Sequence, residues 1–314
     1  MYLLRSRGRS RARPTIGLSV RRLALRRPSH SPTAAPSHST LLLDTDSGPV
    51  NVGIAGPEHA STLVLLHGFG SSLHWWNAIT PLLADRFRVI SMDLLGHGKS
   101  AKPSTGYHPS DHARAVAQVT DRLGVGEDIT VVGHSMGADV AIALAEGATP
   151  VRRVVVIGEG PDYSTFLPGR ATRLLRVPVL GHALRRHPPA PAVRLGYSRA
   201  FAPGFGQRTA FADPDQILHD DRAVQFTAFR HCQLGKEAYT RTCPLDHRIR
   251  VLDVPTLVIF GARDRMWNAE ISVRRYRAVP GVRVEVIDRA GHSPQLETPG
   301  QVARLIAEFA GADR

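Results

Sequence analysis

The chain has 314 residues, of which 42% are hydrophobic and 21% charged, a composition typical of a globular protein. No run of about 18 apolar residues occurs, so no transmembrane helix is predicted. The formal net charge is +13, but residues 1–40 contain nine arginines and no acidic residue, and the rest of the chain carries only +4. Because no aromatic residue beyond Tyr2 lies among those arginines, we expect no nucleic-acid partner.

Residues 1–40 are rich in Arg, Ser and Pro and show no apolar periodicity, so we expect a disordered tail. Two other interpretations stay open, a targeting segment and a mis-called start. The stretch SVRRLAL at 19–25 resembles a twin-arginine signal, but the RRPSHSPTAAPS that follows is not the apolar region that such a signal needs.

The cysteine content favours a reducing compartment. Cys232 and Cys243 are compatible with one disulfide, but nothing indicates secretion, so two free thiols and a cytoplasmic protein are predicted. No CxxC or His/Cys cluster indicates a structural metal, and no cofactor is expected.

From residue 41 onwards, short apolar runs alternate with amphipathic stretches. The first run, LLLDTDSGPVNVGIAG, predicts a hairpin with its turn at 46–49. Because strands alternate with helices, we predict the α/β class, with a mostly parallel sheet covered on both faces. Buried strands are predicted within 62–68, 87–96, 129–135, 151–160, 256–264 and 282–291.

Two helices have recognisable start signals. Residues 110–123 begin at Ser110, a predicted N-cap. The last helix begins with Thr298, Pro299 and Gln301, which predict a capping box with proline in the first turn. Its apolar stripe has helical spacing and comprises Val302, Leu305, Ile306 and Phe309.

Residues 161–250 interrupt the alternation. They contain no clear buried strand, many Pro and Gly residues, and short amphipathic pieces. This interval is far longer than a connecting loop, so an inserted, mostly helical cap is predicted. The core of the fold would then comprise residues 41–160 and 251–314.

The stretch VVGHSMGADV at 131–140 places Ser135 between Gly133 and Gly137. An apolar strand precedes it and a helix-forming run follows, as in a nucleophile elbow, where a sharp strained turn exposes a serine and the flanking residues must be small. The helix beginning at Met136 directs its N-terminal amides at the site, where they favour negative charge.

A serine nucleophile needs a base that is itself oriented by an acid. His292 follows the last predicted strand, and Asp264 follows the strand before it. Since parallel strands share polarity, both should lie at the sheet edge that carries Ser135. Glu159 and Asp162 flank an alternative position for the acid, after an earlier strand.

The stretch HGFG at 67–70 follows another buried strand, and its glycines, Gly68 among them, allow a close backbone approach to substrate. We predict that the amides of Phe69 and Met136 form the oxyanion hole. His67 is expected to brace this loop, and His97, in the GHGKS turn, to be structural.

Three further residues have two open interpretations. Trp75, Trp76 and His134 are possible substrate-pocket residues, but core packing is an equally consistent role for the tryptophans. For His134, packing against the sheet is the preferred interpretation.

Together these motifs resemble the α/β-hydrolase fold superfamily, in its esterase/lipase-like branch with a helical cap. The resemblance covers about residues 41–312 and is specific for fold and triad but not for substrate. The matching residues are His67-Gly68-Phe69-Gly70, MDLLGHGKS at 92–100, the segment Gly133 to Gly137, Gly261 with Asp264, and Gly291-His292.

The resemblance implies a cofactor-independent serine hydrolase that cleaves a carboxylic ester, a thioester or a lipid ester through an acyl-enzyme. Its partner would be a small-molecule ester or lipid-like substrate, and the motifs do not indicate an oligomeric state. Two alternatives stay open. One is a C–C bond hydrolase or cofactor-free peroxidase-like enzyme of the same fold, and the other is a ligand-binding receptor with little turnover.

Overall fold

The computed structural model describes residues 40–168 and 188–312, and the interpretations of the N-terminal tail fall outside them. The described residues contain an eight-stranded sheet with the order β1-β2-β4-β3-β5-β6-β7-β8. Strands β3 to β8 run parallel, whereas β2 is antiparallel to both β1 and β4. The α/β class and every predicted strand are thus confirmed. The strands are β1 (Thr40–Leu43), β2 (Val50–Ala55), β3 (Thr62–Leu66), β4 (Arg88–Met92), β5 (Ile129–His134), β6 (Val151–Ile157), β7 (Thr256–Gly261) and β8 (Val282–Ile287).

The predicted hairpin joins β1 to β2, with Leu43 paired to Val50. Its turn is closed by two backbone hydrogen bonds between Thr45 and Gly48. Gly48 has a φ of 101°, a conformation that favours glycine. The turn therefore lies where the sequence predicts it.

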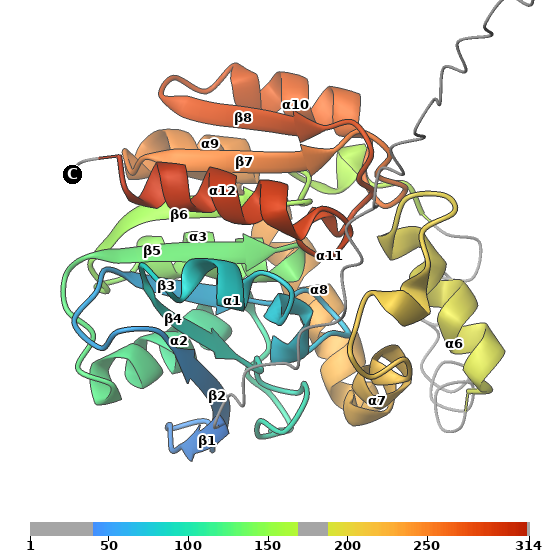
Figure 1. Ribbon diagram of the computed structural model, residues 1–314, viewed down its shortest axis with the longest axis horizontal. Helices are drawn as coiled ribbons and strands as arrows, with labels where there is room; N and C mark the ends of the chain where they lie inside the picture. The colour runs from blue at the N-terminus through green and yellow to red at the C-terminus, as the bar shows by residue number, and fades with distance from the viewer. Residues whose placement is uncertain (1–39, 169–187, 313–314) are drawn as a thin grey trace, which may run out of the picture. The chain divides into compact units, whose positions relative to one another are not determined.

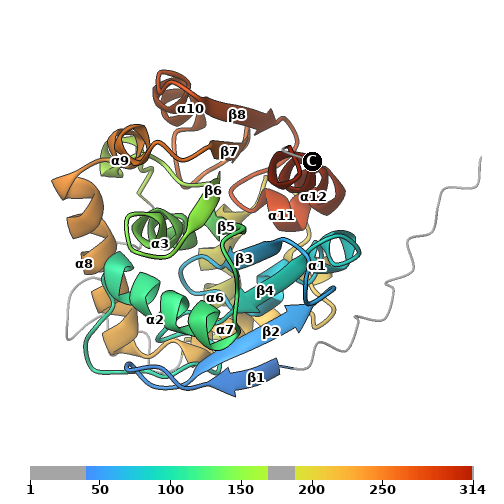
Figure 2. The same cartoon turned by 90° about the vertical axis from the view of Figure 1, so that its left-hand side faces the viewer.

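The central strands are apolar throughout because each faces a hydrophobic core on both sides. In β3, Val64 and Leu66 pack into one core, while Leu63 and Leu65 pack into the other. Helices α2, α3, α9 and α10 cover the first face, and α1 and α12 cover the second (Figure 2). These helices are α1 (Thr80–Leu83), α2 (Pro109–Arg122), α3 (Met136–Ala145), α9 (Leu245–Leu252), α10 (Ala269–Arg277) and α12 (Pro299–Ala310).

The predicted N-cap of α2, Ser110, is wrong by two residues. The N-cap is His108, whose ring accepts from the Ser110 amide, while Asp111 accepts from the His108 amide in return. Pro109 occupies the first helical position, where its restricted φ favours a helix, so the helix begins before Ser110.

The last helix begins as predicted, with Thr298 at the N-cap and Pro299 following it. The predicted capping box does not form, because the Thr298 hydroxyl donates backward to the Pro294 carbonyl at 3.1 Å. Pro294 opens the short helix α11 (Pro294–Glu297), which ends directly before α12 and offers this nearer acceptor.

The elements assigned within the described part of 161–250 are all helical. Helices α8 and α9 contribute buried side chains to the core under α2 and α3, whereas α6 and α7 form a separate apolar cluster with Trp75 and Leu296. Figure 1 shows α6 and α7 beyond the arrowheads of the central strands. The boundaries of the predicted cap stay a prediction. The remaining elements are η1 (Leu73–Trp76), η2 (Tyr163–Thr165), α6 (Ala190–Tyr197), η3 (Ser198–Ala200), η4 (Gln207–Thr209), α7 (Gln216–Ala223) and α8 (Phe226–Thr242).

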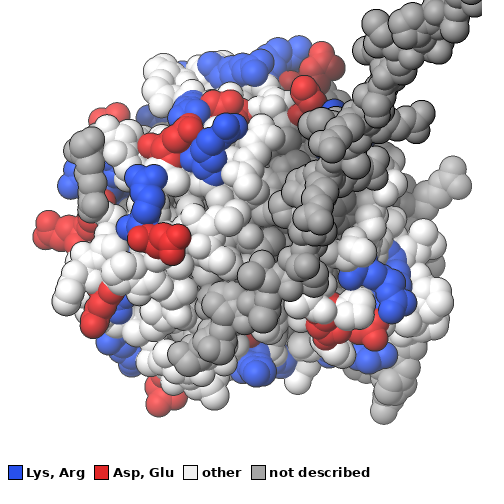
Figure 3. Space-filling view, viewed as in Figure 1, with Lys and Arg blue, Asp and Glu red and all other residues white. Residues whose placement is uncertain are grey.

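Three further features of the described chain are its thiols, the character of its helices and its surface charge. Cys232 and Cys243 are both free thiols, as predicted. Among the described residues, no helix has the length and apolar character needed to span a bilayer. On the face shown in Figure 3, basic and acidic side chains are interspersed.

Candidate active site

Ser135 lies on a strained turn between β5 and α3. Its φ of 50° and ψ of −126° are unfavourable for a residue with a side chain. Its amide donates to the Ile157 carbonyl of β6 at 2.9 Å, which anchors the turn to the sheet. The side chain is half-buried, so part of it remains accessible.

The glycines on either side of Ser135 are required by close backbone contacts. A Cβ at Gly133 would lie 2.2 Å from the Gly137 carbonyl oxygen, and a Cβ at Gly137 would lie 2.2 Å from the carbonyl oxygen of Leu66 in β3. Such distances are far inside van der Waals contact. The geometry is therefore that of the sharp elbow predicted from the sequence.

The loop at 67–70 lies against this turn. A Cβ added to Gly68 would come within 3.1 Å of the Ser135 Cβ. His67 holds the loop, since its Nε2 accepts from the Leu94 amide at 3.0 Å and its Nδ1 donates to the Gly68 carbonyl at 2.7 Å. Burial lowers the pKa of His67 and so favours the neutral ring that these bonds require. His67 thus has the bracing contacts expected of it.

His292 and Asp264 form a hydrogen-bonded pair. The distance from His292 Nδ1 to Asp264 Oδ2 is 2.9 Å, and both side chains are buried. Asp264 Oδ1 accepts from the amides of Met266 and Trp267 at 2.6 and 3.1 Å. With Nδ1 donating to the carboxylate, the lone pair of Nε2 is available to accept a proton.

Ser135 follows β5 and His292 follows β8, two strands that β6 and β7 separate in the sheet, and His134 connects the two segments. His134, next to Ser135, has its ring centroid 5.1 Å from that of His292, and its Nε2 donates to the His292 carbonyl at 2.9 Å. Within the described residues, no hydrogen bond joins the Ser135 hydroxyl to His292. In free enzymes such bonds are often long and tighten only when substrate is bound.

The alternative acids have other partners. Glu159 follows β6, is wholly buried, and has its Oε1 2.7 Å from Lys236 Nζ. Asp162 forms a 2.7 Å ion pair with Arg275. The structure therefore brings Asp264 to His292, while Glu159 contacts Lys236 and Asp162 pairs with Arg275.

The buried contact between Glu159 and Lys236 belongs to a three-residue cluster. Lys236 of α8 lies between Glu159 and Asp139 of α3, and its Nζ donates to Asp139 Oδ2 at 2.7 Å. Burial raises the pKa of Glu159 to about 8, an effect that Lys236 reduces and the neighbouring Asp139 increases. Burial raises the pKa of Asp139 as well, and Lys236 lowers it, so one lysine faces two buried carboxyl groups, and the pKa of about 8 favours a protonated Glu159 at neutral pH.

The possible pocket residues are all buried. Trp75 is 1% exposed, stacks on His134 with a centroid distance of 6.0 Å, and donates from Nε1 to Asp220 Oδ2 at 2.8 Å. Trp76 is fully buried in the core under α1 and α12. Burial lowers the pKa of His134 well below its usual value, and the nearby His292 adds to this effect. These positions are consistent with packing roles, and the substrate-pocket role of the three residues stays a prediction.

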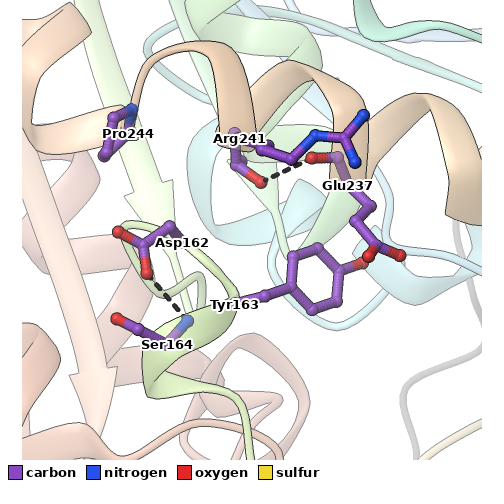
Figure 4. A pocket seen from close by; sticks show the side chains of 7 residues that line it. Asp162, Tyr163, Ser164, Glu237, Arg241 and Pro244 are labelled. Carbon is purple, nitrogen blue, oxygen red and sulfur yellow. Dashed lines mark hydrogen bonds between the residues drawn. The ribbon is translucent and has the colours of Figure 1, made fainter.

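A cavity of about 280 Å³ lies elsewhere, between η2 and α8 (Figure 4). None of the residues that line it is Ser135, Asp264 or His292. The lining residues are Asp162, Tyr163, Ser164, Glu237, Thr240, Arg241 and Pro244.

Two polar contacts near the site were not expected from the sequence. The Tyr197 hydroxyl of α6 donates to the Gly70 carbonyl at 2.6 Å, beside Phe69. Glu297 accepts from the amides of Gly291 and Ser293, which flank His292. The Tyr197–Gly70 contact joins residues 127 positions apart, whereas Glu297 bonds amides only four and six positions before it, and no motif in the sequence analysis indicated either contact.

Comparisons with known proteins show which family and fold the chain shares. A model of the alpha/beta hydrolase family matches residues 63–305. An uncharacterised protein of Mycobacterium tuberculosis is 28% identical over 271 residues, which cover 79% of this chain and 74% of the relative. A 2-hydroxy-6-oxononadienedioate/2-hydroxy-6-oxononatrienedioate hydrolase of Cupriavidus pinatubonensis is 26% identical over 265 residues, or 80% of this chain and 87% of the relative.

Among solved structures, an esterase from Exiguobacterium antarcticum superposes with a TM-score of 0.70 at 18% identity. The match covers 87% of this chain and 100% of the esterase, and at this identity it shows a shared fold. Since the family match also spans most of the chain, the protein belongs to the alpha/beta hydrolase family.

Proposed function

We propose that this hydrolase cleaves a carboxylic ester through an acyl-enzyme, with a thioester or a lipid ester as close variants. The observation that carries the proposal is the 2.9 Å bond between His292 and Asp264 at the sheet edge where Ser135 stands on its strained turn. Nucleophile, acid and base then follow the chain order that is typical of this fold.

In the proposed first half-reaction, Ser135 Oγ attacks the carbonyl carbon while His292 Nε2 takes the hydroxyl proton. The oxyanion of the tetrahedral intermediate is held by the amides of Phe69 and Met136. The Met136 amide is suited to this role because it begins α3 and so has no partner within the helix. The intermediate then collapses, and the alcohol leaves with the proton from His292.

In the second half-reaction, His292 takes a proton from the water that attacks the acyl-enzyme, and it gives this proton to Ser135 Oγ as the acid leaves. Asp264 orients the imidazole through Nδ1 and stabilises the imidazolium that forms in each step. The Met266 and Trp267 amides hold Asp264 in place. No cofactor takes part in the proposed reaction.

A fluorophosphonate probe, which reacts with activated serines, tests this proposal. We expect the wild-type protein to be labelled at Ser135 and the Ser135→Ala variant to remain unlabelled. Circular dichroism would confirm that both are folded. Absence of labelling in folded wild-type protein would refute the serine hydrolase assignment.

C–C bond hydrolysis is a second candidate, favoured by the relative from Cupriavidus pinatubonensis, whose named substrates are conjugated oxo-diacids. The two candidates differ in the bond that breaks. A series of p-nitrophenyl esters assayed beside vinylogous diketones separates them. If kcat/KM is higher for the diketones than for the esters, C–C bond hydrolysis replaces ester cleavage as the proposed reaction.

A further inference from the structure

The carboxylate of Glu297, at the end of α11, accepts three backbone hydrogen bonds. Its Oε1 accepts from the Gly291 amide at 2.9 Å and from the Ser293 amide at 3.2 Å, so it holds the main chain on both sides of His292. Its Oε2 accepts from the Ala202 amide at 2.7 Å. Ala202 lies between η3 and η4, in the interval predicted to form the cap.

The backbone around Ala202 approaches the histidine loop unusually closely. A Cβ at Gly291 would lie 2.3 Å from the Ala202 nitrogen and 2.5 Å from the Phe201 carbonyl carbon, so only glycine allows this contact. Phe201 is 1% exposed and stacks on Trp75 with a centroid distance of 5.9 Å. The segment at 201–202 is thus packed directly on the loop that carries His292.

Two other contacts complete the support of His292. His134 Nε2 donates to its carbonyl, and Asp264 accepts from its ring. The carbonyl ends of the two flanking peptide groups are held by His134, at His292, and by the Arg263 amide, which donates to the Ala290 carbonyl at 2.9 Å, while Glu297 holds their N–H ends. A histidine that moves a proton twice per cycle needs this orientation, because a misplacement of about 1 Å can lower the rate about 100-fold.

We propose that Glu297 is a positioning residue that couples the segment at 201–202 to the orientation of His292. The proposal rests on the function proposed above, since it assigns to Glu297 the support of the catalytic base. A carboxylate suits the role because all three partners are N–H donors and an ionised carboxylate only accepts. Displacement of Ala202 by a ligand would therefore be transmitted to the peptide groups on both sides of His292.

The Glu297→Gln variant tests this role. The side-chain amide has one accepting oxygen, and its NH₂ group faces an N–H donor at Ala202 or at Gly291 and Ser293. We expect kcat for p-nitrophenyl butyrate to fall about 10- to 100-fold, with KM changed less than about threefold. Hydrogen exchange of the Gly291, Ser293 and Ala202 amides should become at least about tenfold faster.

Glu308→Gln is the matched control, because Glu308 is 52% exposed on α12 and, within the described part of the chain, forms ion pairs with Arg283 and Arg304 alone. It should leave kcat and the exchange rates unchanged. Assays well below the melting temperature separate positioning from folding. A Glu297→Gln variant that melts earlier but keeps the wild-type kcat would reduce Glu297 to a structural role and overturn the proposal.

The failure of this proposal is distinguishable from that of the proposed function. If wild-type protein neither labels with fluorophosphonate nor cleaves esters, the catalytic assignment fails, and the positioning role fails with it. If wild-type protein labels and Glu297→Gln labels at the same rate with unchanged exchange, only the inference about Glu297 fails.

Discussion

At the scale of single residues, the strained turn at Ser135 depends on the absence of a Cβ at the two flanking glycines. Gly133 and Gly137 allow β5, α3 and the end of β3 to meet, because neither carries a Cβ. The φ of 50° at Ser135 persists because packing on both sides maintains it.

Adding one methyl group tests this dependence. In Gly133→Ala, the Cβ would lie 2.2 Å from a backbone oxygen that no side-chain motion can move. We expect the free energy of unfolding to fall by at least about 1–3 kcal/mol, as for overpacked sites, measured by urea denaturation.

The control for this variant is Gly300→Ala in α12, where a Cβ would meet no atom within 4 Å. Alanine should stabilise that helix by about 0.5–1 kcal/mol. Equal effects of the two alanines would contradict a close backbone approach at the elbow.

A second prediction at this scale separates the two buried acids that follow β6 and β7. Asp264→Asn should lower kcat about 10⁴-fold, because an amide facing Nδ1 favours the wrong imidazole tautomer. Glu159→Gln should keep kcat within a few-fold, since Glu159 contacts Lys236 and holds its own proton. If kcat fell more in Glu159→Gln than in Asp264→Asn, Glu159 rather than Asp264 would be the acid that orients His292.

At the scale of elements, the Asp139–Lys236–Glu159 cluster ties α3 to α8 and to the end of β6. The Lys236 ammonium also lies 5.2 Å from the ring centroid of Trp267, whose amide donates to Asp264. Removing one member of such a buried ion pair strongly lowers the free energy of unfolding, because the remaining charge is then uncompensated in the protein interior.

The cluster predicts a specific dependence of stability on pH. Folded Glu159 keeps its proton up to a pKa of about 8, whereas its ordinary value is 4.5. Folding therefore takes up a proton between these values, and the stabilisation from this group, complete below pH 4.5, is lost as the pH rises through 8.

Glu159→Gln removes this titration while keeping the shape of the side chain. We expect the urea midpoint of the variant to fall less than that of the wild type between pH 5 and 8.5, with the buffers matched in ionic strength. Parallel curves for the two proteins would mean that folded Glu159 ionises normally.

The starts of two helices show what a local sequence pattern can predict at this scale and what it cannot. The sequence predicts the existence and approximate bounds of α2 and α12, because apolar periodicity and proline act locally. It predicts the cap hydrogen bonds wrongly at Ser110 and Thr298, where His108 and Pro294 compete as partners. Such competition depends on distances of a few ångströms, which a residue pattern does not contain.

At the scale of the whole described chain, the parallel strands bring the residues of the candidate site to one edge of the sheet. Strands β3, β5, β7 and β8 run in one direction, so the loops that follow them meet at one edge. These loops carry Phe69, Ser135, Asp264 and His292. The sequence predicts the shared edge from the common polarity of parallel strands, whereas the order of the strands in the sheet comes from the structure.

The sequence by itself determined the alternation of strands and helices, the elbow around Ser135 and the positions of Asp264 and His292 after their strands. These features are local, since apolar runs, glycines and turn residues act on their immediate neighbours. Only the tertiary structure decided that Asp264 bonds His292 while Glu159 pairs with Lys236, and that Glu297 joins Ala202 to the histidine loop. Such contacts arise where distant segments pack, and they depend on distances that no single stretch of the chain specifies.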